Sequence, residues 1–351
     1  MKLCFRNMTR YIRPLVQTDV ARPRDAYSLA GGWCWFTFVE VLTRTGKSTV
    51  LPASNLEEVE LEPLIAPRAL IAGLSFDAPR LMGILNVTPD SFSDGGLHQS
   101  PHDAVTEAMK MVAIGVDLID IGGESTRPGA EKVMPEDEIE RTTPAIQAIR
   151  EAGVTTPISI DTRKASVGDA AIAAGADIVN DVSGFTYDLT LAVSCAEKGT
   201  PVCVMHAQGD PETMQDEPFY EDVLLDVYDF LKNQIDWLLS QGIPRNLIIA
   251  DPGIGFGKTQ THNLKLLNRI SLFHSLGVPI LLGASRKRFI GTIGNEPIAG
   301  RRAAGSVGVA LAAIGQGVQL IRAHDIAEHK QAIALWQASV TQSLSVKQDL
   351  N

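Results

Sequence analysis

The stretch LMGILNVTPDSFSDGG, residues 81–96, starts as an apolar run and then turns polar. Its apolar part is typical of a strand buried on both faces, as the strands of a parallel sheet are. The polar part begins at Asn86 and includes Asp90, Ser91 and Asp94. Since loops that follow such strands often carry function, these short polar side chains predict a functional loop.

The same change from a helix-like stretch through a glycine to an apolar run recurs along the chain. Glycine tolerates the left-handed conformation that closes the last turn of a helix before a strand begins. The seven joint glycines are Gly115, Gly153, Gly175, Gly199, Gly242, Gly277 and Gly317. The runs that accompany them are LIDI, PISI, IVNDV, VCVM, LIIA, ILLG and VQLI. With the opening strand they predict eight buried strands that alternate with helices.

Eight such units in about 250 residues favour an α/β fold, a (β/α)₈ TIM barrel. A doubly wound open sheet is the structural alternative. Ser100, Pro101 and Asp103 predict a helix that begins near residue 101, since they suit an N-cap, a first turn and a positive helix end.

We expect three parts in the chain. Residues 1–68 form a β-rich N-terminal extension that includes a strand at 35–42, and 69–340 form the barrel. A hairpin at about 69–82 is expected to close the barrel floor, and 341–351 form a C-terminal tail.

Whole-chain properties limit the function classes. The net charge of −10 over 351 residues argues against general binding to nucleic acid or an acidic membrane. The four cysteines form no CxxC pair, so we expect free thiols in a reducing cytoplasm. The most apolar stretch, 306–321, is shorter than the ~20 residues of a membrane span, and we expect no transmembrane segment.

Polar residues follow every predicted strand. In such a barrel the carboxyl ends of the strands meet at one rim, where the active site lies. Burying many polar groups there is costly unless a ligand pairs them. In chain order the strand ends are Asn86, Gly122–Pro128, Asp161, Asn180 with Asp181, Met205 with His206, Asp251, Ser285–Arg288, and Arg322 with His324.

These strand ends divide by charge. The last two predicted strands supply a cationic arc, at a place where barrels often bind phosphate. Its members are Lys287, the arginines on either side of Lys287, and, from the last strand, Arg322 and His324. Opposite this arc we expect Asp161, Asn180 and Asp251, which suit a flat heterocycle with adjacent N–H and NH₂ donors.

Simpler interpretations remain for single residues. Asp181 and Asp251 could each cap a turn, and His206 could be a packed loop residue. The stretch 253–259 resembles a P-loop but has Pro252 where the first glycine is needed, so we interpret it as a loop that places Phe256 at the rim. The seven histidines are scattered, which argues against a zinc hydrolase.

Eight motifs together resemble the dihydropteroate synthase family. The two longest are GILNVTPDSFSDGG (83–96) and GGESTRPGA (122–130). The others are IDT (160–162), NDVSG (180–184), MHAQGDPETMQ (205–215), DPGIGFGKT (251–259), SRK (285–287) and RAHD (322–325). The resemblance covers about residues 69–335 in the right order.

The resemblance implies an enzyme that joins 4-aminobenzoate to (7,8-dihydropterin-6-yl)methyl diphosphate. Diphosphate is released with the assistance of Mg²⁺, and relatives are usually homodimers. We therefore expect small-molecule substrates, a homodimer and a cytoplasmic protein. Ala207 stands where many relatives carry a larger apolar residue, and the N-terminal extension is longer than in the simplest members.

The resemblance also implies residue roles. The pterin would be bound by Asp161, Asn180, Met205, Asp251 and Lys287. The diphosphate would be bound by Asn86, Arg322 and His324, with Asn86 also a ligand of Mg²⁺. The 4-aminobenzoate would be bound by Phe92, Thr126, Pro128 and Phe256. The catalytic group would comprise Asp161, Thr126, Arg127 and Lys287.

The first loop is then expected to be a lid. Residues 88–96 would hinge at Gly95 and Gly96 and carry Phe92 over the second substrate. Whether Asp90, Ser91 and Asp94 contact ligand or metal, or only stabilise the closed loop, stays open.

Three rival functions remain. A methyltransferase that uses a methylated reduced folate would share the pterin site but would not need the diphosphate arc or the STRP loop. A Schiff-base aldolase would use Lys287, with its pKa lowered by Arg286 and Arg288. A non-catalytic pterin-binding relative would be expected to have lost loop residues that are all present in this sequence.

Overall fold

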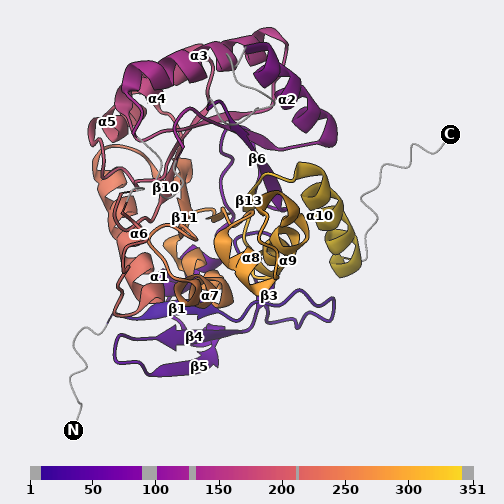
Figure 1. Cartoon of the computed structure of the whole chain (residues 1–351). Helices are drawn as coiled ribbons and strands as arrows, with labels where there is room; N and C mark the ends of the chain where they lie inside the picture. The colour runs from indigo at the N-terminus through magenta and orange to yellow at the C-terminus, as the bar shows by residue number, and fades with distance from the viewer. Residues whose placement is uncertain (1–8, 89–100, 126–131, 211–212, 342–351) are drawn as a thin grey trace, which may run out of the picture.

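The protein is described by a computed structural model that covers residues 9–88, 101–125, 132–210 and 213–341 (Figure 1). Eight parallel strands form one sheet of order β11-β10-β9-β8-β7-β6-β13-β12. They are β6 (Arg80–Asn86), β7 (Leu118–Gly122), β8 (Ile158–Asp161), β9 (Ile178–Asp181), β10 (Val202–Met205), β11 (Ile248–Asp251), β12 (Leu281–Leu282) and β13 (Leu320–Ala323). A parallel bridge between Ala250 and Ile280 joins the two ends of the sheet. The predicted barrel is confirmed, and the open-sheet alternative is wrong.

Helices connect successive strands and surround the sheet (Figure 1). The α-helices are α2 (Pro101–Ile114), α3 (Pro135–Glu151), α4 (Ala165–Ala174), α5 (Thr190–Lys198), α6 (Val223–Ser240), α7 (Gln260–Asn268), α8 (Arg288–Ile293), α9 (Ala303–Ile314) and α10 (Ile326–Thr341). Short 3₁₀ helices are η2 (Arg245–Leu247), η3 (Ile270–Leu276) and η4 (Ala299–Arg301). The helix expected near residue 101 begins at Pro101. All seven joint glycines have φ between 64° and 113°, which confirms the left-handed joints.

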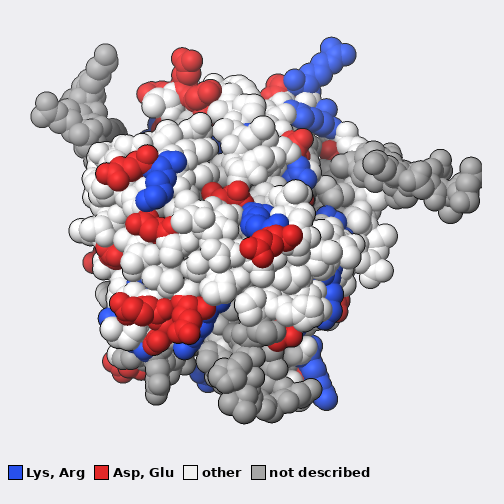
Figure 2. Space-filling view, turned by 90° about the horizontal axis from the view of Figure 1, so that it is seen from above, with Lys and Arg blue, Asp and Glu red and all other residues white. Residues whose placement is uncertain are grey.

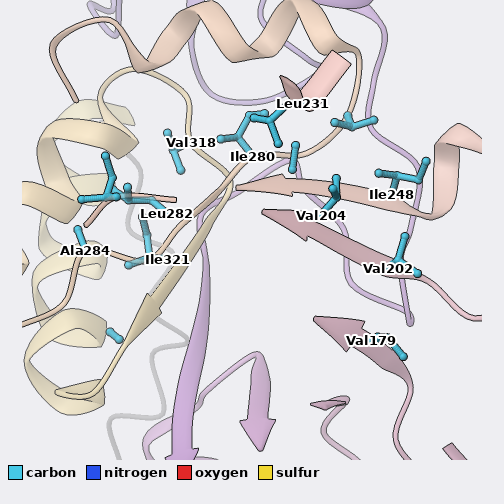
Figure 3. Packing of buried hydrophobic residues seen from close by; sticks show 14 of the residues in the cluster. Val179, Val202, Val204, Leu231, Ile248, Ile280, Leu282, Ala284, Val318 and Ile321 are labelled. Atoms are coloured by element: carbon cyan, nitrogen blue, oxygen red, sulfur yellow. The ribbon is translucent and has the colours of Figure 1, made fainter. Parts of the chain in front are cut away.

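Side chains of the barrel strands alternate between two environments, because successive residues of a strand point to opposite sides. The outward residues pack against the helices, as Val179, Val204 and Ile321 show in Figure 3. Inward residues at the amino ends of the strands form a separate apolar cluster, which we call the floor cluster. Its members are Ile71, Phe76, Met82, Leu118, Ile178, Cys203, Ile249, Leu281 and Leu320.

The segment before β6 closes the floor. Ile71 is 0% exposed and Phe76 is 2% exposed, and both pack among the inward strand residues. The expected hairpin over 69–82 is shorter than predicted. Ile71 and Leu74 share one antiparallel bridge, whereas Met82 already belongs to β6, so a tight turn closes the barrel.

The N-terminal region is rich in short strands. They are β1 (Tyr11–Pro14), β2 (Tyr27–Ser28), β3 (Trp35–Phe36), β4 (Phe38–Leu42) and β5 (Ser48–Pro52), followed by η1 (Ala53–Asn55) and helix α1 (Glu58–Ile65). The predicted strand at 35–42 is interrupted at Thr37, because its halves pair differently. Phe36 lies opposite Tyr27, whereas Phe38 lies opposite Pro52 in the sheet β1-β4-β5.

This region is fastened to the outside of the barrel, at the bottom of Figure 1. Arg44 Nη1 lies 2.6 Å from Asp226 Oδ1, and the Tyr11 hydroxyl donates to Asp229 Oδ2 at 2.8 Å. Both acceptors lie on α6. The Ser271 hydroxyl on η3 donates to the Pro14 carbonyl at 3.1 Å. Side-chain contacts to two elements therefore hold the sheet in place.

The surface carries both signs of charge. On the face shown in Figure 2, acidic and basic side chains are interspersed among the described residues. No helix in the described part of the chain is both long and apolar enough to cross a membrane. Cys34, Cys195 and Cys203 are buried free thiols, as expected, and Cys4 lies outside the described residues.

Candidate active site

A layer of inward polar side chains lies directly above the floor cluster. On four strands, a polar residue follows the inward floor residue at a spacing of two, so both point into the barrel. The pairs are Leu118 with Asp120, Ile178 with Asn180, Ile249 with Asp251, and Leu320 with Arg322. With Asp161 at the end of β8, we call Asp120, Asp161, Asn180, Asp251 and Arg322 the rim set. On β10 the corresponding inward residue is Met205.

The strand register brings the predicted residues together. Asn86 lies opposite Gly122, Gly122 opposite Asp161, and Asp161 opposite Asn180 across four neighbouring strands. On the other side of the barrel, Met205 lies opposite Asp251. Five predicted binding residues therefore share one edge of the sheet.

Arg322 is the centre of the rim set. Its Nε donates to Asp120 Oδ2 at 2.6 Å and its Nη2 donates to Asp161 Oδ2 at 2.9 Å. The Asn180 amide donates to Asp120 Oδ1 at 3.3 Å. Although burial acts to lower it, Asp120 and Asp161 raise the pKa of Arg322, so the guanidinium stays charged. The expected separation of cations from carboxylates is wrong here, because Arg322 is ion-paired with Asp161.

Asp161 is 7% exposed and lies in the barrel interior. Burial raises the pKa of its carboxyl well above the usual value, and the Asp120 carboxylate adds to this, whereas Arg322 opposes it. A carboxylate that is poorly solvated gains strongly from a nearby positive charge. Asp161 is thus suited to stabilise a cation in the barrel.

Asp251 and Lys287 lie on the opposite side of the site. Asp251 Oδ1 accepts a hydrogen bond from the Gly253 amide at 2.7 Å, so its predicted turn-forming role is present. Burial raises the pKa of Asp251. The Lys287 ammonium donates to the Ile254 carbonyl and lies 4.3 Å from the centre of the Phe256 ring. Phe256 is therefore at the rim, as predicted.

The pKa of Lys287 is lowered to about 7, first by burial and then by Arg322, whereas Asp251 opposes the shift. The prediction that Arg286 and Arg288 cause this shift is wrong. Arg286 has a φ of 60°, and its Nε donates to Asp325 Oδ2 at 3.1 Å. Because its guanidinium is paired with Asp325, Arg286 does not join Lys287 in the cationic arc.

Two more predicted residues lie at neighbouring strand ends. His324 Nδ1 lies 3.1 Å from the Ser285 hydroxyl, which fixes the ring at the end of β13. A Cβ atom added at Gly122 would lie 3.6 Å from Asn86 Oδ1 and 3.5 Å from Asp161 Cβ. Asn86 and Asp161 thus flank the same position at the end of β7.

The fit to Mg²⁺ follows from this arrangement. No group of three or more histidine, cysteine, aspartate or glutamate side chains forms a metal site within the described ranges. Mg²⁺ commonly keeps several waters and binds one or two protein oxygens together with substrate phosphates. The Asn86 amide oxygen at the end of β6 is one protein oxygen of the kind that would hold such an ion.

Other polar residues of these loops have structural partners. Asp181 accepts from the Ser183 amide at 2.7 Å and from the Phe185 amide at 2.9 Å, so it caps its loop. His206 Nδ1 lies 2.7 Å from the Lys258 Nζ, which confirms His206 as a packed loop residue.

The sequence shows Lys258 only as part of a P-loop resemblance, and the structure gives it another role. It is 3% exposed, and its ammonium also donates to the Gly253 carbonyl at 2.8 Å and the Phe256 carbonyl at 3.0 Å. Burial lowers the pKa of Lys258 and of His206 well below their usual values. Lys258 holds the loop that carries Phe256 against the neighbouring loop.

A cavity of about 360 Å³ opens beside Phe256, between the loops that follow β8, β9, β10 and β11. Arg163 and Tyr187 are among its lining residues, with the guanidinium 4.5 Å from the centre of the tyrosine ring. The predicted residues Phe92, Thr126, Arg127 and Pro128 lie outside the described residues, as do Asp90, Ser91 and Asp94.

Sequence comparison agrees with this geometry. The profile of the family described as pterin binding enzyme matches residues 82–324, from β6 to the end of β13. The dihydropteroate synthase of Escherichia coli (strain K12) is 43% identical over 268 residues, which are 76% of this chain and 94% of that protein. The chain belongs to the dihydropteroate synthase family of pterin binding enzymes. As a member of this family it is an enzyme, a transferase.

Solved dihydropteroate synthases share the fold. A Xanthomonas albilineans dihydropteroate synthase with 4-aminobenzoic acid has a TM-score of 0.73 and 42% identity, and the match covers 78% of this chain and 98% of that chain. A Yersinia pestis dihydropteroate synthase with a sulfonamide drug has a TM-score of 0.72 and 41% identity, covering 76% of this chain and 96% of that one. The family match starts at residue 82, so the β-rich N-terminal region lies outside it.

One residue of the rim set, Asp120, was not predicted from the sequence. Asp120 is 0% exposed and contacts Arg322, Asn180 and the Ser159 hydroxyl. It lies inside the run LIDI, which was interpreted only as a buried strand. A single carboxylate in an otherwise apolar strand was the available signal, because such a group is costly to bury without a partner.

Proposed function

We propose that this enzyme condenses 4-aminobenzoate with (7,8-dihydropterin-6-yl)methyl diphosphate to give 7,8-dihydropteroate and diphosphate. The observation that carries the proposal is the rim set, in which buried carboxylates and a buried amide surround the partly exposed guanidinium of Arg322 inside the barrel. The family membership supports it, as do Xanthomonas albilineans dihydropteroate synthase structures with 4-aminobenzoic acid and with 7,8-dihydropteroate.

The pterin would lie above the floor cluster. Asp251 and Asn180 offer acceptors for the ring N–H and NH₂ donors, and Lys287 offers a donor to the ring oxygen or nitrogen. Met205 supplies an apolar surface for the ring between them. Asn180 and Asp251 already have partners within the protein, Asp120 and the Gly253 amide, and each keeps further acceptor capacity for such a ligand.

The diphosphate would lie near Asn86, Arg322 and His324. Two donor atoms of Arg322, Nε and Nη2, are used by carboxylates, which leaves its Nη1 donors for a phosphate oxygen. Mg²⁺ bound by Asn86 and the diphosphate would neutralise charge on the leaving group.

The reaction would begin with cleavage of the C–O bond between the pterin methylene and the diphosphate, which leaves with the electron pair. The carbon becomes a cation conjugated with the pterin, and Asp161 stabilises it. The amine of 4-aminobenzoate then forms the new C–N bond. Its proton is acidic once that bond exists and is lost to water or diphosphate, so no strong general base is needed.

The second substrate would be bound by the two loops and by Phe256. Phe92, Thr126 and Pro128 would shape its pocket, with Thr126 and Arg127 also in the catalytic group. Loop residues over the site would exclude water, which would otherwise capture the cation. We also propose a homodimer, on the family resemblance alone.

The test is product formation by the purified protein. With Mg²⁺ and both substrates, we expect 7,8-dihydropteroate and diphosphate in equal amounts, and competitive inhibition by a sulfonamide against 4-aminobenzoate. Removing Mg²⁺ with a chelator is expected to lower the rate, and adding Mg²⁺ back to restore it. Folded protein that consumes neither substrate would overturn the proposal.

A further inference from the structure

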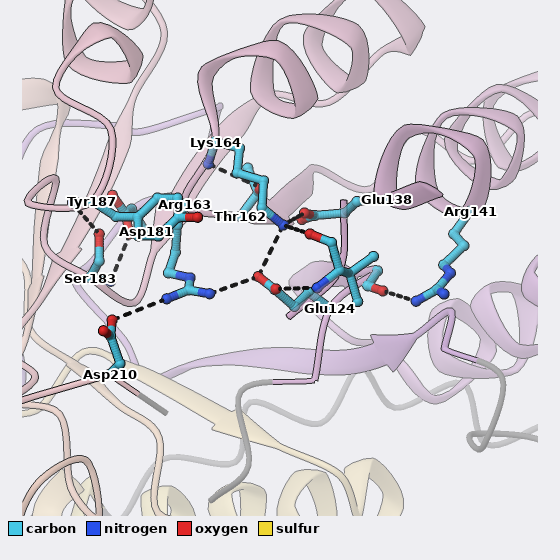
Figure 4. Close-up of polar contacts among 12 residues, drawn as sticks. Glu124, Glu138, Arg141, Thr162, Arg163, Lys164, Asp181, Ser183, Tyr187 and Asp210 are labelled. Carbon is cyan, nitrogen blue, oxygen red and sulfur yellow. Dashed lines mark hydrogen bonds and ion pairs between the residues drawn. The ribbon is translucent and has the colours of Figure 1, made fainter. Parts of the chain in front are cut away.

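A buried ionic cluster lies between the end of β7, helix α3 and the segment that joins β8 to α4 (Figure 4). It consists of Glu124 after β7, Glu138 on α3, and Arg163 and Lys164 after β8, and we call it the clasp. These residues are 7%, 0%, 7% and 4% exposed, respectively. The clasp places two carboxyl groups against two basic side chains, and all four side chains are largely buried.

The clasp ties together the two ends of the segment that separates Glu124 from Val133. Glu124 Oε1 accepts a hydrogen bond from the Val133 amide at 3.0 Å. The Lys164 ammonium donates to the Val133 carbonyl at 2.8 Å and lies 3.2 Å from Glu124 Oε2. It also donates to Glu138 on the following helix. One ammonium therefore contacts both ends of the segment and the helix behind it.

Neighbouring groups favour the ionised form of Glu124. Burial acts to raise the pKa of Glu124, but the Val133 amide, Arg163 and Lys164 hold it below its usual value. Arg163 Nη2 donates to Glu124 Oε2 at 3.1 Å, so the carboxylate meets both cations. Buried ion pairs often add little stability over well-packed apolar groups, although breaking one is costly. A role in fixing geometry accounts for such a cluster better than stability does.

The clasp is also rigidly connected to the pterin side of the site. Lys164 is the N-cap residue of α4 and lies three positions after Asp161. The same strand end thus supplies the carboxylate proposed to stabilise the cation and the ammonium that contacts Glu124 and Val133. This links the position of the loop ends to the position of Asp161.

We propose that Lys164 is a positioning residue for the second substrate. Through Glu124 and Val133 it fixes where the loop of Thr126, Arg127 and Pro128 leaves and rejoins the barrel, and thereby sets the affinity for 4-aminobenzoate. The inference rests on the proposed function, because that function assigns the loop to the 4-aminobenzoate site. Small displacements of substrate-positioning groups can cost large factors in rate.

The experiment compares Lys164→Met with Lys198→Met. Lys198 pairs with Asp169 at 2.9 Å on the outer helices, so its loss is a matched removal of one lysine–carboxylate pair. For Lys164→Met we expect the KM for 4-aminobenzoate to rise about tenfold or more, and kcat to fall. The dissociation constant for a pterin, measured separately with 6-hydroxymethylpterin, should stay within about twofold. Lys198→Met should change neither constant.

Two further variants keep the proposal testable if Lys164→Met does not fold. Glu124→Gln keeps the side-chain volume and an acceptor for the Val133 amide but removes the ion pairs. We again expect a higher KM for 4-aminobenzoate and a nearly unchanged dissociation constant for 6-hydroxymethylpterin. Lys164→Arg keeps the charge and should recover part of the 4-aminobenzoate affinity. In hydrogen exchange, the Val133 amide should exchange faster in Glu124→Gln than in the wild type, because a neutral amide oxygen is a weaker acceptor than a carboxylate.

An unchanged KM for 4-aminobenzoate in the folded variants would contradict the proposal. So would equal increases in this KM and in the dissociation constant for 6-hydroxymethylpterin. An equal rise would indicate general loosening of the barrel. If the wild type makes no dihydropteroate, the proposed function fails instead. Unchanged Val133 exchange in Glu124→Gln would overturn the clasp whatever the reaction is.

Discussion

The two ends of the barrel interior are built by the same strands and have opposite chemistry. At the amino ends, residues such as Leu118, Ile249 and Leu320 form the apolar floor cluster with Ile71 and Phe76. Two positions later, several of the same strands carry the members of the rim set. The floor buries apolar surface and stabilises the fold, whereas the rim buries charge at a cost in stability. On these strands, the residues that stabilise the fold and the residues that would bind ligand are therefore only about 7 Å apart.

The largest effect is expected for Arg322→Met. The change leaves Asp120 and Asp161 without their cation, so we expect the unfolding free energy to fall by about 3–5 kcal/mol. It also removes a cation proposed to bind diphosphate, so kcat/KM should fall by about 10³-fold. Urea unfolding and steady-state kinetics on the same preparation measure both.

The matched control for this change is Arg44→Met. Arg44 also bridges two carboxylates, Asp226 and Asp229, but on the outer surface. Because exposed ion pairs contribute about 0–1 kcal/mol, we expect a small loss of stability and no change in kcat/KM. A kcat/KM of Arg322→Met within tenfold of the control would remove Arg322 from the reaction.

Phe76→Ala tests the floor. The ring is 2% exposed in the floor cluster, and its removal should lower the unfolding free energy by about 3–5 kcal/mol. Since the rim set does not depend on this side chain, kcat/KM of the folded enzyme should stay within about threefold. If Phe76→Ala lowers the pterin affinity as well as the unfolding free energy, the floor cluster and the rim set are not independent.

Ile249→Val is a smaller test on a single strand. It removes one buried methylene from the floor cluster, two residues before Asp251. We expect a loss of about 0.5–1.5 kcal/mol in unfolding free energy and unchanged pterin binding. Denaturant unfolding gives the first quantity and ligand titration the second. An effect on pterin binding alone would contradict the division of the strand.

A pH comparison of wild type with Asp251→Asn gives a still finer test. Burial raises the pKa of Asp251 above its ordinary value, so this carboxyl ionises in the unfolded chain before it does in the folded protein as pH rises. Wild-type stability from this group is therefore present at low pH and is lost as pH rises through the raised pKa. The stability of Asp251→Asn relative to wild type should increase from about pH 4 to pH 7. A difference that is constant with pH would contradict the raised pKa.

Much of the fold could be predicted because its signals are local. A glycine at each joint and a short apolar run after it identify helix ends and buried strands without any knowledge of contacts. The N-terminal region was harder, since strand pairing there depends on distant residues. The break at Thr37 follows from the different partners of Phe36 and Phe38, which the sequence does not show.

The site could be predicted as a set of strand ends, but its internal pairing could not. Polarity at a strand end predicts which residues face the rim, whereas ion pairs depend on side-chain packing across the barrel. Arg322 thus forms an ion pair with Asp161, although the sequence predicts that the two lie on opposite sides of the site. Arg286 pairs with Asp325. Asp120 and Lys258 were missed because an apolar strand and an imperfect P-loop hid their charges.

The most direct test of the central claim is the affinity of Asp251→Asn for a pterin. The change keeps the shape of the side chain and an acceptor for the Gly253 amide, but it removes the rim carboxylate. With 6-hydroxymethylpterin as the probe, we predict a dissociation constant raised on the order of 100-fold, since two charge-assisted hydrogen bonds are weakened. The unfolding free energy at pH 7 should equal or exceed that of wild type, and Ile249→Val should bind the pterin normally. Wild-type pterin affinity in Asp251→Asn would contradict the account.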